Sequence, residues 1–191
     1  MRFYPQTILL ASGSPRRREL LTQAGFRFRV VPPDIDEEQT AGRPLREIPE
    51  WLASEKAKAC SHLQQAGEII LACDTVVLLN DHIYGKPRGR EEAIRMLQDL
   101  SGCRHEVISG VCLLRGNQSH HFSETTRVTF GQLSLEQIHY YLDHYQPYDK
   151  AGSYGIQEWI GLTGIEKIEG DYFNVMGLPV HRILQELTHF V

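Results

Sequence analysis

The sequence predicts an α/β fold in which helices flank a mixed β-sheet. Short apolar runs alternate with segments of helical periodicity along the 191 residues, and this alternation is typical of α/β proteins. The run at 69–79 is almost entirely apolar, as expected of a strand that is covered on both faces. Tight turns at 80–82 and 116–117 join neighbouring strands, so antiparallel pairs must accompany any parallel ones.

Each predicted strand is a short apolar run bounded by polar or turn-forming residues. In chain order, the strands are expected at 8–11, 28–31, 69–79, 83–84, 106–114, 125–130 and 165–168. The segment 32–44, between the second and third strands, is polar and contains several prolines, and it is therefore predicted to be a loop.

The predicted helices have recognisable start and stop signals. They are expected at 15–24, 49–66, 91–100, 135–145 and 179–189. The first has Ser14 at its N-cap and Gly25 just past its end, which are favourable residues at those positions. Gly67 is expected to end the second helix, and Ser134 and Gln137 have the spacing of a capping box at the start of the fourth.

Composition limits the class of protein. Apolar residues make up 41% and charged residues 23% of the chain, which excludes disordered and fibrous classes. No linker or repeat divides the sequence, so residues 1–191 are expected to form a single domain. The net charge of -4 argues against a general nucleic-acid binder, although a local cationic patch would still suit a small anion.

The four cysteines indicate a reducing compartment. They form no CxxC pair, and we expect reduced thiols in a cytoplasmic protein. The apolar run at 8–11 is too short for a signal peptide or a membrane span, so no membrane partner is expected. The histidines show neither HExxH nor a Cys/His zinc spacing, which argues against a structural zinc site.

A loop of small residues followed by arginines suggests a phosphate site. In Ser12-Gly13-Ser14-Pro15-Arg16-Arg17-Arg18, three arginines fall in the first turn of a helix, where each cation opposes the helix dipole by about 0.3–1 kcal/mol. A strand, a small-residue loop and a helix N-terminus together form a cradle of backbone N–H groups for phosphate, and arginines would add bidentate donors. The alternative is a capped surface helix with solvated arginines.

Two charged residues interrupt apolar patterns. Asp74 lies in the run 69–79 on the same strand face as Ala72, and a buried carboxylate must meet a metal, a cation or water. Alternatively, Asp74 begins a turn at a strand end. Lys56 shares an apolar helical stripe with Leu52, Ala59 and Leu63, so it either extends to solvent at the edge of the stripe or projects into a site that holds anions.

Three further segments contain groups suited to a nucleotide site. The acidic run at 34–38 is either a solvated loop or a source of oxygen ligands for Mg²⁺, which prefers one or two carboxylates plus substrate phosphates. Lys86 lies between Gly85 and Pro87, in a shaped loop or an ordinary surface turn. In the glycine-rich segment 149–157, Gln157 is either solvated or offers the donor and acceptor needed to read a base edge.

Together these segments resemble the Maf family of nucleoside triphosphate pyrophosphatases over essentially the whole chain. The resemblance implies an inosine-triphosphatase-like architecture with two lobes around a cleft, and hydrolysis of a nucleoside triphosphate to the monophosphate and pyrophosphate. The motifs that carry it are ASGSPRRREL at 11–20, DIDE at 34–37, SEKAKA at 54–59, ACDTVV at 72–77, GKP at 85–87, LSG at 100–102, YDKAGSYGIQ at 148–157 and GDYFNVMGLP at 170–179.

The resemblance also implies a base preference. The 149–157 segment is similar to the branch of the family that prefers dTTP and UTP rather than 7-methyl-GTP. In that branch the specificity positions match Arg16, Thr75 and Gln157 of this sequence, and the proposed proton acceptor matches Asp74. An amide can pair with both the N3–H donor and the carbonyl acceptors of thymine and uracil.

The resulting hypothesis is a metal-assisted attack of water on the α-phosphorus. The substrate would be bound by Ser12, Ser14, Arg16, Arg17, Lys56 and Lys86, with Thr75 and Gln157 adding specificity. Glu37 and Asp74 would hold Mg²⁺ or Mn²⁺, and Asp36 or Glu38 are alternatives to Glu37.

Two other functions would use the same residues. One is a nucleotide-binding regulator with little turnover, and the other is a phosphatase or phosphotransferase that cleaves the β–γ bond. Modified pyrimidine nucleotides would also fit the same base-reading group. A homodimer is the default expectation, because twofold dimers are the commonest oligomers.

Overall fold

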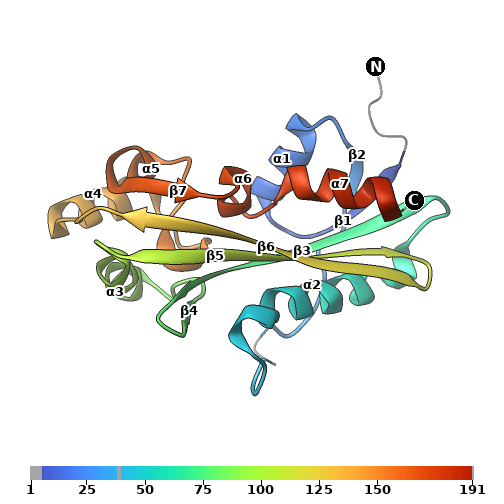
Figure 1. The fold of residues 1–191 in the computed structure, drawn as a ribbon, viewed down its shortest axis with the longest axis horizontal. Coiled ribbons are helices and arrows are strands. Elements are labelled where there is room, and N and C mark those ends of the chain that lie inside the picture. Colours follow the sequence, from blue (N-terminus) through green and yellow to red (C-terminus); the bar gives the residue numbers. More distant parts are fainter. Residues whose placement is uncertain (1–5, 38–39, 191) are drawn as a thin grey trace. The chain divides into compact units, whose positions relative to one another are not determined.

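The computed structural model describes residues 6–37 and 40–190. This part of the chain contains seven strands and seven α-helices (Figure 1). The strands are β1 (Thr7–Ala11), β2 (Arg27–Val30), β3 (Glu68–Leu79), β4 (His82–Tyr84), β5 (Arg104–Arg115), β6 (Gln118–Phe130) and β7 (Ile165–Glu169). The helices are α1 (Pro15–Gln23), α2 (Ile48–Ala59), α3 (Arg90–Leu100), α4 (Leu135–Tyr145), α5 (Trp159–Gly164), α6 (Tyr172–Val175) and α7 (Val180–Phe190).

The strands form a sheet in the order β2-β1-β3-β5-β6-β7, and β4 pairs with β3 outside this path. β1 is parallel to both β2 and β3, whereas β4 and β7 are antiparallel to their partners. The predicted α/β fold with a mixed sheet and flanking helices is therefore confirmed. Among the described residues, no helix has the length and apolar character needed to span a membrane.

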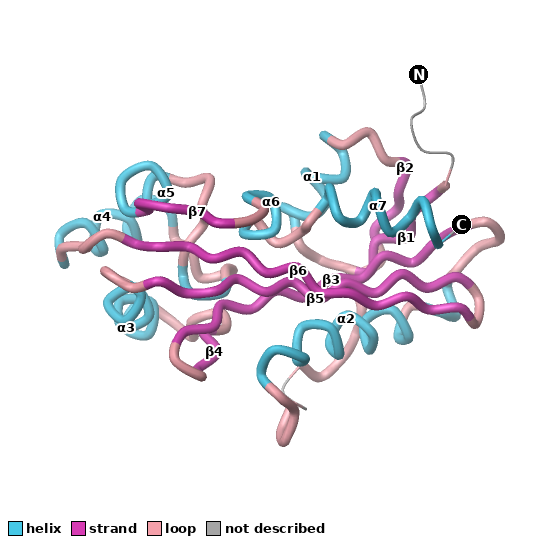
Figure 2. The backbone as a smooth tube through the Cα atoms, in the orientation of Figure 1, coloured by secondary structure: helices cyan, strands magenta, loops and turns pink. Residues whose placement is uncertain are grey.

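The chain divides into two compact units. Unit 1 comprises Met1–Asp74, Ser109–Glu124 and Gly177–Val191, and unit 2 comprises Thr75–Ile108 and Thr125–Met176. β3, β5 and β6 each contribute residues to both units. Figure 2 shows each of these strands as a continuous stretch of backbone.

In unit 1, α2 packs closely against one face of the sheet, while α1 and α7 lie on the other (Figure 1). Small residues of α2, Ala53 and Ala57, pack with residues of β1, β3 and β5. The first turn of α2 crosses β5 at Gly110, where a Cβ atom would lie 2.1 Å from the backbone nitrogen of Glu50. The absence of a side chain at Gly110 therefore lets the first turn of α2 lie directly on β5.

The second helix is shorter than predicted. The sequence pattern predicts a helix over 49–66, but α2 ends at Ala59 and is followed by a single 3₁₀ turn, Ser61–Leu63. The Ser61 hydroxyl donates to the Lys58 carbonyl, and the Gln64 amide donates to the carbonyls of Glu68 and Leu114. These bonds draw the chain toward the strands, so Leu63 is exposed and does not continue the stripe that contains Lys56.

Sequence periodicity also misses part of β6 and two short helices. β6 begins at Gln118 rather than near 125, because pairing with β5 extends it through polar residues that lack apolar alternation. α5 contains two glycines, and a Cβ at Gly161 would lie 1.8 Å from the Ile156 carbonyl oxygen. α6 is a single turn capped by Asp171, whose carboxylate accepts from the Phe173 backbone N–H.

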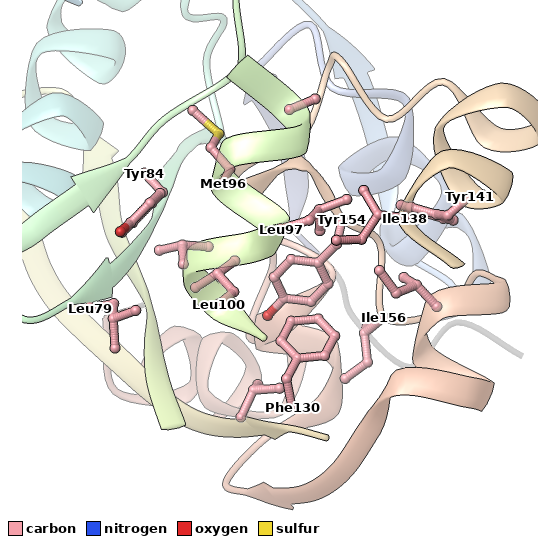
Figure 3. Close-up of a cluster of buried hydrophobic side chains, with 14 of the residues drawn as sticks. Leu79, Tyr84, Met96, Leu97, Leu100, Phe130, Ile138, Tyr141, Tyr154 and Ile156 are labelled. Atoms are coloured by element: carbon pink, nitrogen blue, oxygen red, sulfur yellow. The ribbon is translucent and has the colours of Figure 1, made fainter. Parts of the chain in front are cut away.

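Unit 2 has its own apolar core, built from α3, α4, the strands and the segment around residue 155 (Figure 3). His105 is part of this core, and 1% of its surface is exposed. Its Nε2 atom lies 2.7 Å from the Tyr154 hydroxyl, and its ring stacks on Phe130. Burial lowers the pKa of His105 to about 4, so the imidazole is neutral at pH 7.

The low pKa of His105 predicts a loss of stability in acid. The unfolded chain takes up a proton near the ordinary pKa of 6.5, whereas the folded protein takes it up only near 4, so the free energy of unfolding falls as the pH drops between these values. We expect it to be about 2.5 kcal/mol lower at pH 4.5 than at pH 8 from this group alone. Urea titrations at both pH values should show this difference reduced in His105→Gln.

The exposed His139 of α4 provides a matched control. His139→Gln should keep the wild-type difference in unfolding free energy between pH 8 and pH 4.5. An equal difference in wild type and His105→Gln would contradict the assignment to His105.

Candidate active site

The loop between β1 and α1 begins where β1 stops pairing. Ala11, the last residue of β1, pairs with Ala72 of β3. Ser14 caps α1, since its Oγ accepts from the Arg17 backbone N–H, and the Ser14 backbone N–H donates to Ser12 Oγ at 3.1 Å. The predicted cap is confirmed. The expected cradle differs in detail, because these two backbone N–H groups are bonded to serine hydroxyls of the loop.

Arg17 anchors this loop to the segment that precedes α7. It is buried, its Nε donates to the Gly177 carbonyl at 2.8 Å, and its Nη1 donates to Ser12 Oγ at 3.2 Å. The Cys73 thiol also donates to the Gly177 carbonyl, at 3.4 Å. Arg17, in the first turn of α1, and Cys73, the residue before Asp74, therefore both donate to the Gly177 carbonyl. Arg16 is half-buried.

Asp74 lies in β3, two residues after Ala72, which pairs with the last residue of β1. It is on the face of β3 that α2 covers. Lys56 of α2 meets it there, with Nζ 2.5 Å from Asp74 Oδ1 and 2.7 Å from Glu37 Oε1. The exposed fractions are 7% for the Lys56 side chain, 12% for Asp74 and 48% for Glu37. The structure thus brings together three predicted site residues that are distant in the sequence.

This cluster, Glu37, Lys56 and Asp74, places one buried ammonium between two carboxylates. A buried carboxylate is expensive unless it is paired, and the prediction that Asp74 meets a cation is confirmed by Lys56. Two alternatives are wrong: Asp74 lies inside β3 rather than at a turn, and Lys56 does not extend to solvent. One buried ammonium is therefore shared by two carboxylates.

The oxygen donors of the cluster suit a hard divalent cation. Within the described residues, no group of three or more His, Cys, Asp or Glu side chains has metal-binding geometry. Glu37 and Asp74 nevertheless converge on one positive charge, and Mg²⁺ commonly uses one or two carboxylates plus substrate phosphates. These two residues therefore fit the predicted ion. Asp36 is exposed, and Glu38 lies outside the described residues.

The other predicted site residues belong to unit 2. Thr75 follows Asp74 in β3 and is half-buried, whereas Lys86 and Gln157 are exposed. The backbone N–H of Gly152 donates to the carbonyl of Gly85 at 3.1 Å. The loop that carries Lys86 and the segment that leads to Gln157 are thus hydrogen-bonded to each other.

The structure adds polar groups that the motifs do not assign. Lys150 is buried and forms ion pairs with Asp149 and Glu158. Gly177 supplies the carbonyl that Arg17 and Cys73 share. Lys150 and Gly177 both fall within quoted motifs, but the sequence contains no signal for a partner that is distant along the chain.

Comparisons with known proteins agree with the motifs. The family model described as "Maf-like protein" matches residues 7–190. The "dTTP/UTP pyrophosphatase" of Porphyromonas gingivalis strain W83 is 48% identical, covering 96% of this chain and 94% of that protein. The protein of the same name from Bacteroides thetaiotaomicron is 46% identical, covering 94% of each.

A solved structure, that of the Staphylococcus aureus Ham1 protein, is similar with a TM-score of 0.43 and 16% identity, covering 65% of this chain and 72% of that one. The family model covers nearly all of this chain, and the relatives match it at almost full length. The chain therefore belongs to the Maf family.

Proposed function

We propose that this chain hydrolyses dTTP and UTP to the corresponding monophosphates and pyrophosphate. The observation that carries the proposal is the cluster in which Lys56 joins Asp74 to Glu37, at the end of β1 where α1 begins. Hydrolysis needs a proton acceptor beside the phosphates, whereas binding alone does not. The names of the relatives, which match almost the full length of the chain, support the choice of substrate.

The phosphate groups are assigned to the loop at the start of α1 and to further cationic side chains. Ser12, Ser14 and Arg16 contact the phosphates, and Arg17 holds the loop in shape while adding positive charge. Lys86 neutralises a further phosphate charge. Positioning and electrostatic stabilisation of this kind supply most of the catalysis in phosphoryl chemistry.

Asp74 acts as the proton acceptor. The oxygen of the attacking water forms a bond to the α-phosphorus, and the water gives a proton to Asp74 Oδ. The bond between the α-phosphorus and the oxygen that bridges it to the β-phosphorus breaks, and its electron pair leaves with pyrophosphate. Glu37 and Asp74 would hold Mg²⁺ or Mn²⁺, which when bound neutralises phosphate charge and makes water more acidic. Lys56 keeps the two carboxylates together.

A panel of nucleoside triphosphates tests the function directly. Each is incubated with Mg²⁺ or Mn²⁺, and pyrophosphate and orthophosphate are measured separately. Pyrophosphate from dTTP and UTP, abolished by EDTA, is the expected result. Orthophosphate alone would indicate β–γ cleavage, and binding without either product would indicate a regulator. Triphosphates of modified pyrimidines that keep the N3–H and its flanking carbonyls are expected to react as well.

Gln157 is assigned to base recognition, with Thr75 and Arg16 as further specificity residues. Replacing Gln157 by Ala removes the amide donor and acceptor, so we expect kcat/KM for dTTP relative to dCTP to fall at least about tenfold, while phosphate binding persists. Gln118→Ala, at an exposed position of β6, should leave the ratio unchanged. An unaltered ratio in Gln157→Ala would exclude this role.

We further infer a cytoplasmic protein that acts without nucleic acid and associates as a homodimer. None of the four cysteines, all of which lie in the described residues, forms a disulfide, which suits a reducing compartment. Light scattering coupled to size-exclusion chromatography tests the dimer, and a monomer mass would contradict it.

A further inference from the structure

The turn that carries Gln157 is held by a buried charged side chain. Lys150 is 9% exposed, and its Nζ lies 3.1 Å from Glu158 Oε1 and 2.8 Å from Asp149 Oδ1. Glu158 directly follows Gln157. Buried ion pairs contribute little net stability compared with apolar packing, so this arrangement suggests a role in fixing a conformation.

Tyr141 of α4 connects both ends of the same turn. Its hydroxyl donates to Glu158 Oε2 and accepts from the Gly155 backbone N–H at 3.0 Å. The ring is fully buried in the unit 2 core (Figure 3). Burial, together with the bond to Glu158, raises the pKa of Tyr141, so the hydroxyl keeps the proton that it donates. Gln157 lies between the two residues that this hydroxyl binds.

The backbone leading into the turn is constrained as well. Gly152 and Ser153 both have left-handed conformations, with φ of 66° and 60°. For a serine this conformation is unfavourable and persists only where the surroundings enforce it. A Cβ at Gly155 would lie 2.8 Å from the Glu158 carboxyl carbon. The turn therefore combines two left-handed residues with a close approach of the Glu158 carboxylate to Gly155.

We propose that Tyr141, Glu158 and Lys150 are positioning residues for base selectivity. Tyr141 and Lys150 orient Glu158 and the Gly155 backbone, and these orient the amide of Gln157 between them. The inference rests on the proposed function, because it assigns a purpose to the turn that carries the proposed base-reading group. A preorganised amide discriminates between bases better than a mobile one, since no ordering cost is added on binding.

Tyr141→Phe is the sharpest test, since it removes only the hydroxyl and keeps the buried ring. We expect kcat/KM for dTTP relative to dCTP to fall about tenfold. The double variant with Gln157→Ala should have the same ratio as Gln157→Ala alone, because the hydroxyl acts through that amide. The matched control is Tyr140→Phe, the adjacent and partly exposed tyrosine of α4, which should keep the wild-type ratio.

The outcomes separate this inference from the proposed function. An unchanged ratio in Tyr141→Phe, or a loss that adds to that of Gln157→Ala, would overturn the positioning role. Absence of pyrophosphate from every nucleotide with the wild-type protein would instead overturn the function itself. If Tyr141→Phe does not fold, Glu158→Gln replaces it, since the amide keeps an acceptor for Tyr141 but loses the ion pair with Lys150. We expect Glu158→Gln to lower kcat/KM for dTTP relative to dCTP by the same factor. The double variant with Gln157→Ala should again have the ratio of Gln157→Ala alone.

Discussion

Asp74→Asn should lower kcat for dTTP by about a thousandfold or more while the protein stays folded. The amide has the size of the carboxylate and can still accept a hydrogen bond from Lys56, which lies 2.5 Å from Asp74 Oδ1. It cannot accept a proton, and general-base catalysis accounts for roughly 10²–10⁴ in rate. Asp74→Asn also removes one of the two carboxylate charges proposed to bind the metal, so the loss of kcat should lie at the upper end of that range.

Pyrophosphate release at saturating dTTP measures this effect, and far-UV circular dichroism checks the fold. Asp81→Asn is the control. Asp81 is exposed in the turn between β3 and β4 and has a left-handed conformation, with φ of 58°, which Asn adopts readily. That variant should match wild type. If Asp74→Asn kept the wild-type kcat, Asp74 would not be the proton acceptor.

Lys56→Met should damage both stability and activity. It leaves the carboxylates of Asp74 and Glu37 close together without the ammonium between them. Removing one partner of a buried ion pair typically costs 3–5 kcal/mol, and because Glu37 is half-exposed we expect the low end, about 3 kcal/mol in the free energy of unfolding. Turnover of dTTP should fall at least about a hundredfold, since a cation near the phosphates is lost.

Divalent cations should restore part of this stability. In Lys56→Met, millimolar Mg²⁺ or Mn²⁺ is expected to raise the melting temperature more than in wild type, because a cation can replace the missing ammonium between the carboxylates. Lys58→Met is the matched control. Lys58 lies on the same helix, is 66% exposed and pairs with Glu55, and such surface pairs are worth about 1 kcal/mol or less. Equal destabilisation by the two substitutions would refute the role of Lys56.

Local signals in the sequence predicted much of the fold. Ser14 caps α1, and Ser134 and Gln137 form the expected capping box of α4. Asn80 and Asp81 both adopt the left-handed conformation that the predicted turn requires. Each of these signals acts within a few residues, so the chain needs no distant partner to specify the element.

The sequence alone also identified the residues that depart from local rules. An aspartate in an apolar strand indicated a charged or polar partner, because a buried carboxylate is costly without one. A lysine on an apolar helix face left two outcomes open, extension to solvent or a site that holds anions. Only the tertiary structure decided which groups bond to each other. Lys56 pairs with Asp74, Arg17 donates to the Gly177 carbonyl, and Tyr141 donates to Glu158. The tertiary structure also decided where α2 ends and where β6 begins. These contacts join residues far apart in the chain, and their energies depend on burial and sheet pairing, which local sequence patterns do not encode.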